Sequence, residues 1–296
     1  MISMQISHGT LIGICAILLW STLIGLMRIV SDGLGPLLGP ASIYAVAFVI
    51  TLICTGFPRL SSFPRSYLIL GSILFVAYEI LLSLSISFAE NSRQAIEVAI
   101  LNYLWPALVV IFSTFLNHQK IRIWIIIGIC CSMYGICTVL GGEYDFNLDE
   151  ILKNLSSNPL SYIFATVAAF LWAIYCSVTA KISKGQTSIT FFLLLIAIVL
   201  WSYGLTFNTY AVNFDLKTAL ALLCAGAAIG LGYAAWNKGM ACGNVRVLAV
   251  LSYFIPILST LVSSLMLNTP LSFTFWKGVL FVCLGSVFCL KSLKKS

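Results

Sequence analysis

The chain has 296 residues, of which 60% are hydrophobic and only 8% are charged. A soluble domain carries about 25% charged residues, so this composition excludes an ordinary water-soluble globule and indicates a membrane protein. The net charge of +7 does not indicate nucleic-acid binding, because the basic residues are spread over short polar links and the C-terminal tail.

Apolar windows separated by polar breaks predict ten membrane spans. A helical span needs about 20 apolar residues, and the alternating pattern of an outer-membrane barrel is missing from the sequence. We therefore expect an all-α polytopic membrane protein. Since the first apolar run follows no Lys or Arg and precedes many more, we expect a first span and no cleaved signal. The predicted spans lie near 9–30, 36–56, 66–88, 93–115, 121–140, 159–180, 187–206, 216–237, 244–267 and 271–290.

The distribution of Lys and Arg predicts the orientation of the chain. Links on one side carry many more basic residues than links on the other, which have Arg93, Lys153 and Lys217, with Arg28 and Lys277 near the helix ends on that side. By the positive-inside rule, the basic side faces the cytoplasm and both termini lie there. The residues predicted inside are Arg59, Arg65, Lys120, Arg122, Lys181, Lys184, Lys238, Lys291, Lys294 and Lys295.

The two halves of the sequence repeat each other at a shift of about 150 residues. "NYLWP" (102–106) corresponds to "SYFIP" (252–256), "AILLW" (16–20) corresponds to "AAFLW" (168–172), and Gly128 and Gly135 correspond to Gly278 and Gly285. We predict one five-helix repeat over 1–145, a polar extracytoplasmic connection over 146–158, and a second repeat over 159–296. Because five is odd, the second repeat enters the membrane inverted, as in alternating-access transporters with a central cavity between the repeats.

Large aromatic residues in the middle of spans are the first candidates for a binding site. They suggest an aromatic-lined cavity for planar or cationic ligands, although packed or lipid-facing rings are an alternative. Asn102 and Asn237 either bind a ligand or bridge helices. The aromatic candidates are Trp20, Tyr78, Tyr103, Trp105, Trp172, Tyr175, Tyr233 and Tyr253.

Two acidic residues and two prolines stand inside predicted spans. Glu79 lies deep enough that it must face protein or water, whereas Glu97 either reaches the interface or pairs with Arg93 four residues earlier. Pro106 frees a backbone carbonyl near Asn102, and freed groups are tolerated in a bilayer only against protein or a wet cavity. Pro106 and Pro256 are therefore candidate hinges, and a simple kink is the alternative.

Motifs for catalysis and for metal or cofactor binding are missing from the sequence. There is no HExxH, GxSxG or Walker loop, and ten cysteines and two histidines include no CxxC pair. Most of the cysteines lie in apolar stretches, where they are expected to be small buried hydrophobes. We expect neither an enzyme nor a cofactor or metal site.

Three long strings resemble members of the drug/metabolite transporter superfamily, in its EamA branch of bacterial inner-membrane amino acid exporters: "GICAILLWSTLIGLMRIVSDGLGP" (13–36), "RQAIEVAILNYLWP" (93–106) and "YAAWNKGMACGNVRVLAVLSYFIP" (233–256). Lys238 departs from the apolar or aromatic residue expected there. The resemblance implies export of Phe, Tyr and Trp, with other amino acids and methyl viologen as further substrates, from a bacterial inner membrane. It places Trp20, Asn102, Tyr103, Trp105, Trp236, Asn237, Tyr253 and Pro256 on matching motifs.

The alternative within the same superfamily is export of a multidrug cation or of another metabolite. A cation exporter is expected to need a membrane acid, and Glu79 is the candidate. In both cases the expected partners are a small-molecule substrate and the lipid bilayer, without nucleic acid.

Overall fold

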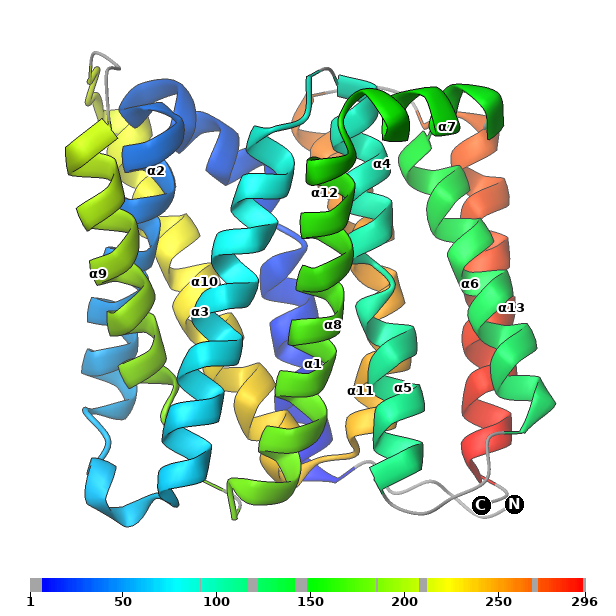
Figure 1. Ribbon diagram of the computed structural model, residues 1–296, viewed down its shortest axis with the longest axis horizontal. Helices are drawn as coiled ribbons and strands as arrows, with labels where there is room; N and C mark the ends of the chain where they lie inside the picture. Colours follow the sequence, from blue (N-terminus) through cyan, green and yellow to red (C-terminus); the bar gives the residue numbers. More distant parts are fainter. Residues whose placement is uncertain are drawn as a thin grey trace. The chain divides into compact units, whose positions relative to one another are not determined.

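The computed structural model describes residues 7–90, 92–116, 122–141, 148–184, 186–207, 212–267 and 271–294. These residues form α-helices and short 3-10 turns, and no strand occurs among them (Figure 1). The helices are α1 (His8–Trp20), α2 (Leu23–Thr55), α3 (Arg65–Ser87), α4 (Ser92–Asn102), α5 (Trp105–Leu116), α6 (Ile123–Gly141), α7 (Leu148–Ser157), α8 (Pro159–Ile182), α9 (Ile189–Phe207), α10 (Leu216–Cys242), α11 (Val245–Leu251), α12 (Ile255–Leu267) and α13 (Phe273–Lys294), with 3-10 turns η1 (Leu60–Ser62) and η2 (Ser252–Phe254).

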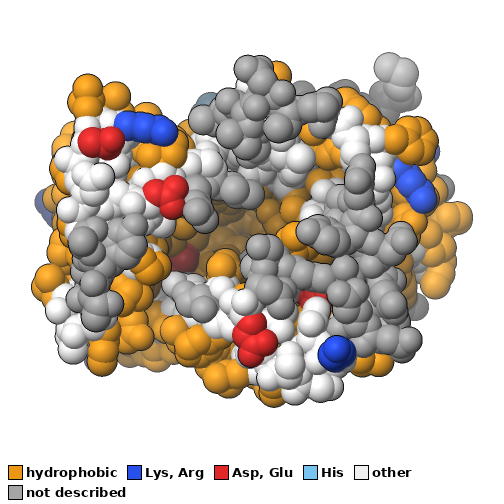
Figure 2. All heavy atoms as spheres, turned by 90° about the horizontal axis from the view of Figure 1, so that it is seen from above, with side chains coloured by type: hydrophobic (Ala, Val, Ile, Leu, Met, Phe, Trp, Pro, Cys, Tyr) orange, Lys and Arg blue, Asp and Glu red, His pale blue; other side chains and the backbone are white. Residues whose placement is uncertain are grey.

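The predicted ten-span, all-α membrane fold is confirmed. In the part of the chain that the structure describes, nine helical stretches have the length and hydropathy to cross a membrane, and the shorter apolar helix His8–Trp20 adds a tenth. Apolar side chains such as Ile53, Leu205 and Leu265 are more than 70% exposed. Such side chains also appear on the flanks in Figure 2, where few described charges are seen. A surface of this kind is suited to lipid.

The first span differs from its prediction, because the helix expected over 9–30 breaks after Trp20. At the break, the Ser21 hydroxyl donates to the Ile17 carbonyl at 2.6 Å, and the Thr22 hydroxyl donates to the Leu19 carbonyl at 2.8 Å. These bonds satisfy carbonyls that a bilayer could not. The chain turns again inside α2 at Gly35, which has φ 84° and ψ 167°. Glycine tolerates this positive φ because it has no Cβ.

The connection between the repeats, predicted only as polar, contains the helix α7. Its apolar residues Leu148, Ile151, Leu152 and Leu155 follow the i, i+3, i+4, i+7 pattern of an amphipathic helix. In Figure 1 this helix runs crosswise to α8 and leads into the start of that helix. The pattern was readable in the sequence, and the polar composition of the segment obscured it.

The helices form two compact units. Unit 1 contains α1, α2, α9 and α10, together with the start of α3, the end of α8 and the last residues of α12. Unit 2 contains the rest of α3, α8 and α12, together with α4 to α7, α11 and α13. Each unit therefore takes helices from both sequence halves. The repeat boundaries at 1–145 and 159–296 describe the duplication of the sequence and stay a prediction.

In unit 2, α6 and α13 show the inverted relation of the repeats directly (Figure 1). A Cβ built on Gly128 would lie 2.6 Å from the Gly285 carbonyl oxygen, and one on Gly135 would lie 2.7 Å from the Gly278 carbonyl oxygen. The equivalent positions thus meet crosswise, as in an isologous two-fold contact. Cys131 Sγ even donates to the carbonyl of its own equivalent, Phe281, at 3.3 Å. The two equivalent helices are therefore antiparallel.

Equivalent helices are antiparallel in unit 1 as well. The Thr55 and Thr190 hydroxyls, at the end of α2 and the start of α9, are 3.1 Å apart. At the other end of the pair, Gly204 of α9 lies against Leu38 of α2. Since α2 and α9 follow the first helix of each sequence half, their antiparallel packing repeats in unit 1 the relation seen between α6 and α13.

Candidate functional site

Four of the predicted aromatic residues come together in unit 2, around Trp172 of α8. The Trp172 ring stacks on Tyr78 of α3 (centroids 4.8 Å apart, 26° between planes) and on Tyr175 (5.1 Å, 16°). Trp105, the first residue of α5, meets Trp172 edge-on at 6.2 Å. Phe75, which the sequence did not single out, completes the cluster at 6.2 Å from Trp172. These distances are typical of attractive aromatic pairs.

A polar group borders this aromatic cluster. The Asn102 side chain lies beside Tyr78, and its Oδ1 is buried and has no hydrogen-bond partner among the described residues. A buried acceptor of this kind is costly unless something binds it. Glu79, adjacent to Tyr78 and only 7% exposed, adds a carboxyl group beside the cluster.

Both copies of the proline motif break their helices. Helix α4 ends at Asn102 and α5 begins at Trp105, so that Pro106 lies in the first turn of α5. In the second half, α11 ends at Leu251, η2 follows, and Pro256 lies in the first turn of α12. Proline is tolerated in a first turn because the N–H it lacks would have no partner there. The break places Asn102 and Trp105 on either side of it.

Tyr103 and Tyr253 belong to a second, apolar cluster of unit 2. Tyr253 is fully buried with Ala107, Ile136 and Ile257, and Tyr103 packs against this group. The Tyr253 hydroxyl has no hydrogen-bond partner among the described residues. Two candidates thus lie next to the broken helices, packed mainly with aliphatic side chains.

The remaining aromatic candidates meet in unit 1. Trp20, at the end of α1, lies 5.1 Å from Tyr233 and 5.3 Å from Trp236 of α10, measured between ring centroids. A Cβ on Gly232 would lie 2.6 Å from Trp20 Nε1, so the absence of a side chain lets the indole approach α10. The Asn237 amide donates to the Tyr233 carbonyl in its own helix at 2.9 Å.

Glu97 has partners that the sequence did not suggest. It is 6% exposed and accepts hydrogen bonds from the Tyr162 hydroxyl and from Asn154 Nδ2, which lies 3.2 Å from Oε1. The predicted pairing with Arg93 lies outside the described residues, because the side chain of Arg93 is not among them. Tyr162 and Asn154 come from α8 and α7, and only the tertiary structure brings them to α4.

The fold and these clusters define a class of protein: a helical membrane transporter built from inverted repeats. Residues 7–141 and 159–291 each match the model of the EamA-like transporter family. These two matches cover most of the chain, and the chain therefore belongs to the EamA-like transporter family and is a multi-pass membrane transporter.

Two curated relatives span nearly the same length. The chain is 46% identical over 286 residues to the aromatic amino acid exporter YddG of Salmonella typhimurium (strain 14028s / SGSC 2262), covering 97% of this chain and 98% of that protein. It is 45% identical over 281 residues to the aromatic amino acid exporter YddG of Escherichia coli (strain K12), covering 95% and 96%. A crystal structure with a TM-score of 0.78 and 24% identity covers 96% of this chain and 97% of that one, and shares the fold.

Proposed function

We propose that this transporter exports the aromatic amino acids Phe, Tyr and Trp by alternating access, with other amino acids and methyl viologen as further substrates. The proposal is supported by near full-length relatives that carry the name of aromatic amino acid exporters. It also fits the inverted arrangement of equivalent helices, which lets two similar elements exchange roles on the two sides of a membrane.

The observation that carries the proposal is the aromatic cluster of unit 2 with its unpaired acceptor. An aromatic amino acid needs ring surface for its side chain and polar contacts for its ammonium and carboxylate groups. Trp105, Trp172 and Tyr78 offer ring surface, and Asn102 Oδ1 is an unsatisfied acceptor suited to an ammonium donor. We assign the ring to this cluster and the ammonium group to Asn102.

The broken helices have a role in the same proposal. Discontinuous helices are typical of transporter binding sites, because their free backbone groups face the cavity. In unit 2 the break after Asn102 carries the polar contact on one side and Trp105 on the other. We assign Pro106 and Pro256 as hinges that keep these breaks open during the transport cycle.

The chain is proposed to lie in a bacterial inner membrane with both termini in the cytoplasm. In unit 1 the Tyr67 hydroxyl accepts from the Ser188 N–H at 3.2 Å, and Thr10 accepts from the Asn244 N–H at 3.0 Å. These contacts join the segments that carry exposed basic side chains at one end of the unit, which positive-inside topology assigns to the cytoplasm. The side chains are Arg59, Arg65, Lys181, Lys184 and Lys238.

The opposite end of unit 1 carries negative charge. There Asp215 caps α10 by accepting from the Thr218 N–H at 2.7 Å. Hydrogen bonds from Thr218 lower the pKa of the Asp215 carboxyl, so this group remains ionised at neutral pH. Membrane-impermeant labelling of a cysteine introduced at Lys184 or Lys217 in whole cells tests the assignment, and only Lys217→Cys should react from outside.

The test of function is counterflow of radiolabelled phenylalanine into proteoliposomes preloaded with unlabelled phenylalanine, at equal pH on both sides. Label should accumulate above the level in vesicles without protein. Trp105→Ala should reduce the initial rate roughly tenfold, because it removes one ring from the cluster. Folded wild-type protein that accumulates no label would contradict the proposal, and an unchanged rate for Trp105→Ala would remove this residue from the site.

The second candidate, export of an organic cation, is favoured by one observation, the buried Glu79 beside Tyr78. A carboxylate next to stacked rings can bind a planar cation by charge and by cation–π contact. Glu79→Gln should then abolish resistance of cells to methyl viologen while phenylalanine counterflow continues. If resistance is retained, Glu79 is not a cation ligand.

A further inference from the structure

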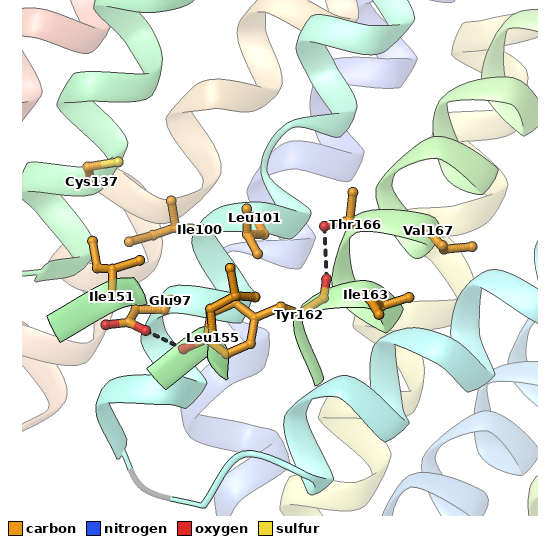
Figure 3. Close-up of a pocket in the computed structure, with 10 residues that line it drawn as sticks. All are labelled: Glu97, Ile100, Leu101, Cys137, Ile151, Leu155, Tyr162, Ile163, Thr166 and Val167. Carbon is orange, nitrogen blue, oxygen red and sulfur yellow. Dashed lines mark hydrogen bonds between the residues drawn. The ribbon is translucent and has the colours of Figure 1, made fainter. Parts of the chain in front are cut away.

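A cavity lies in unit 2, separate from the aromatic cluster. It has a volume of about 510 Å³ and is lined by α4, α6, α7 and α8 (Figure 3). None of the rings of Tyr78, Trp105, Trp172 and Tyr175 lines it. Its size is within the range of sites for small organic ligands, about 300–1,000 Å³.

The walls of this cavity are mostly aliphatic, and Glu97, Tyr162 and Thr166 are its polar lining residues. Ile100 and Leu101 of α4 form the inner wall, Ile151 and Leu155 of α7 cover one end, and Cys137 faces it from α6 (Figure 3). Such a surface offers dispersion contacts and very few polar ones. A zwitterionic amino acid would find no basic side chain for its carboxylate along this lining.

The cavity continues into the outer flank of α8. Ile163 and Val167 line it and are nevertheless 54% and 40% exposed. They continue a stripe with Leu160 and Phe170, which are 47% and 42% exposed. This stripe belongs to a helix with the length and hydropathy of a membrane span, so its exposed apolar side chains are suited to lipid. The mouth of the cavity therefore opens toward a surface that lipid chains can cover.

Hydrogen bonds hold helix α7 over the other end of the cavity. Gln94 Nε2 donates to Ser157 Oγ at 3.3 Å, and Asn158 Nδ2 donates to the Phe88 carbonyl at 2.6 Å. Closer to the cavity, Tyr162 and Asn154 donate to Glu97. These bonds hold Ile151 and Leu155 against the cavity and place polar groups where the span meets the interface.

The acid at the polar end has no counterpart in the second repeat. At the shift of 150 residues that relates "NYLWP" to "SYFIP", Glu97 corresponds to Val247. Val247 is buried in α11, so the broken helix forms in the second repeat without an acid at this position. Glu97 and its partners are therefore specific to this cavity and are not needed to build the repeated helices.

We propose that this cavity binds one acyl chain of a membrane lipid, which enters across Ile163 and Val167 and lies between α4 and α8. The chain fills an aliphatic space that is continuous with the lipid-facing surface. The headgroup of the same lipid lies near the polar residues that fasten α7. Occupancy fills the space between α4 and α8, and so supports the contact between these helices from the two repeats.

The test uses the full chain in vesicles of phosphatidylethanolamine and phosphatidylglycerol that contain phosphatidylethanolamine with a diazirine in one acyl chain. After irradiation, labelled residues are mapped by peptide mass spectrometry. We expect labels on Leu101 and Cys137, on the cavity walls, in addition to Leu160 on the outer flank. Cys137→Phe should reduce labelling of Leu101 roughly tenfold relative to Leu160, because the added ring overfills the site.

Cys130→Phe is the matched control. Cys130 lies two turns before Cys137 on α6, about 10 Å away at 1.5 Å per residue; it is exposed and does not line the cavity. The Cys130→Phe substitution should leave the labelling of Leu101 unchanged. Thr166→Leu fills the cavity from α8 and provides the test if Cys137→Phe does not fold.

Three results would overturn the proposal. Folded wild-type protein labelled on Leu160 and Phe170 but not on Leu101 or Cys137 would show that no chain enters the cavity. Labelling of Leu101 that is unchanged by a folded cavity-filling variant would place the lipid elsewhere. Loss of the Leu101 label on addition of free phenylalanine would assign the cavity to the transported substrate.

Discussion

The duplicated tryptophans Trp20 and Trp172 occupy similar places in the two repeats but very different surroundings. Trp172 lies within the continuous helix α8, is 1% exposed and contacts four rings. Trp20 is the last residue of α1, directly before the break at Ser21 and Thr22, and is only half-buried. Each stands close to a tyrosine on another helix, Trp172 to Tyr78 of α3 at 4.8 Å and Trp20 to Tyr233 of α10 at 5.1 Å.

This difference shows that the two repeats keep a contact between Trp and Tyr but place the tryptophan differently, within a helix in one repeat and at a helix end in the other. The ring of Trp172 cannot move far without moving α8 or opening a void in a close-packed core. The ring of Trp20 stands at a helix end, where a few backbone dihedrals can change its position. We therefore infer that the rings around Trp172 form a fixed surface, and that the ring of Trp20 can change its position relative to Tyr233 and Trp236.

The largest expected effect separates the two tryptophans. Trp172→Ala should lower the free energy of unfolding by about 3–5 kcal/mol, as large-to-small substitutions of buried aromatic residues do. Trp20→Ala should cost less than half as much, because its ring is only half-buried. Thermal unfolding of both variants in the same detergent measures the difference. Equal losses would show that Trp20 is as fixed as Trp172.

The second prediction concerns the approach of Trp20 to α10. Gly232→Ala places a Cβ 2.6 Å from Trp20 Nε1, which forces the indole to move. Overpacking lowers the free energy of unfolding by about 1–3 kcal/mol. The better helix propensity of alanine raises it by about 1 kcal/mol. We expect a net loss of about 1 kcal/mol together with slower phenylalanine counterflow.

Gly204→Ala in α9 is the control for Gly232→Ala. Its new Cβ would meet the flexible end of the Leu38 side chain at 3.0 Å, so the neighbour can move away. Unfolding and counterflow should stay close to wild type. If Gly232→Ala also behaves in this way, the position of Trp20 is not set by the space at Gly232.

Much of this architecture could be predicted because its signals are local. Apolar stretches gave the spans, and the repeated "NYLWP" and "SYFIP" marked both broken helices. The break after Trp20 was missed because Ser21 and Thr22 form it without proline or glycine, by hydrogen bonds to their own helix. The partners of Glu97 were missed because they come from distant segments, α7 and α8, which only packing brings to α4.

The smallest expected change in stability concerns the two prolines, and it tests whether the fixed cluster depends on its broken helix. Pro106→Ala restores an N–H that can bond the Asn102 carbonyl, which favours joining α4 to α5. That change would turn Trp105 away from Trp172. In the second repeat, Ile255 precedes Pro256, so Pro256→Ala moves no ring of the cluster. Both substitutions lie in a first turn, where proline and alanine are tolerated, and each should change the free energy of unfolding by less than about 1 kcal/mol.

Phenylalanine counterflow should fall several-fold for Pro106→Ala and clearly less for Pro256→Ala. Equal losses of transport would indicate that the two prolines act as symmetric hinges, and that Pro106 has no separate role in positioning Trp105.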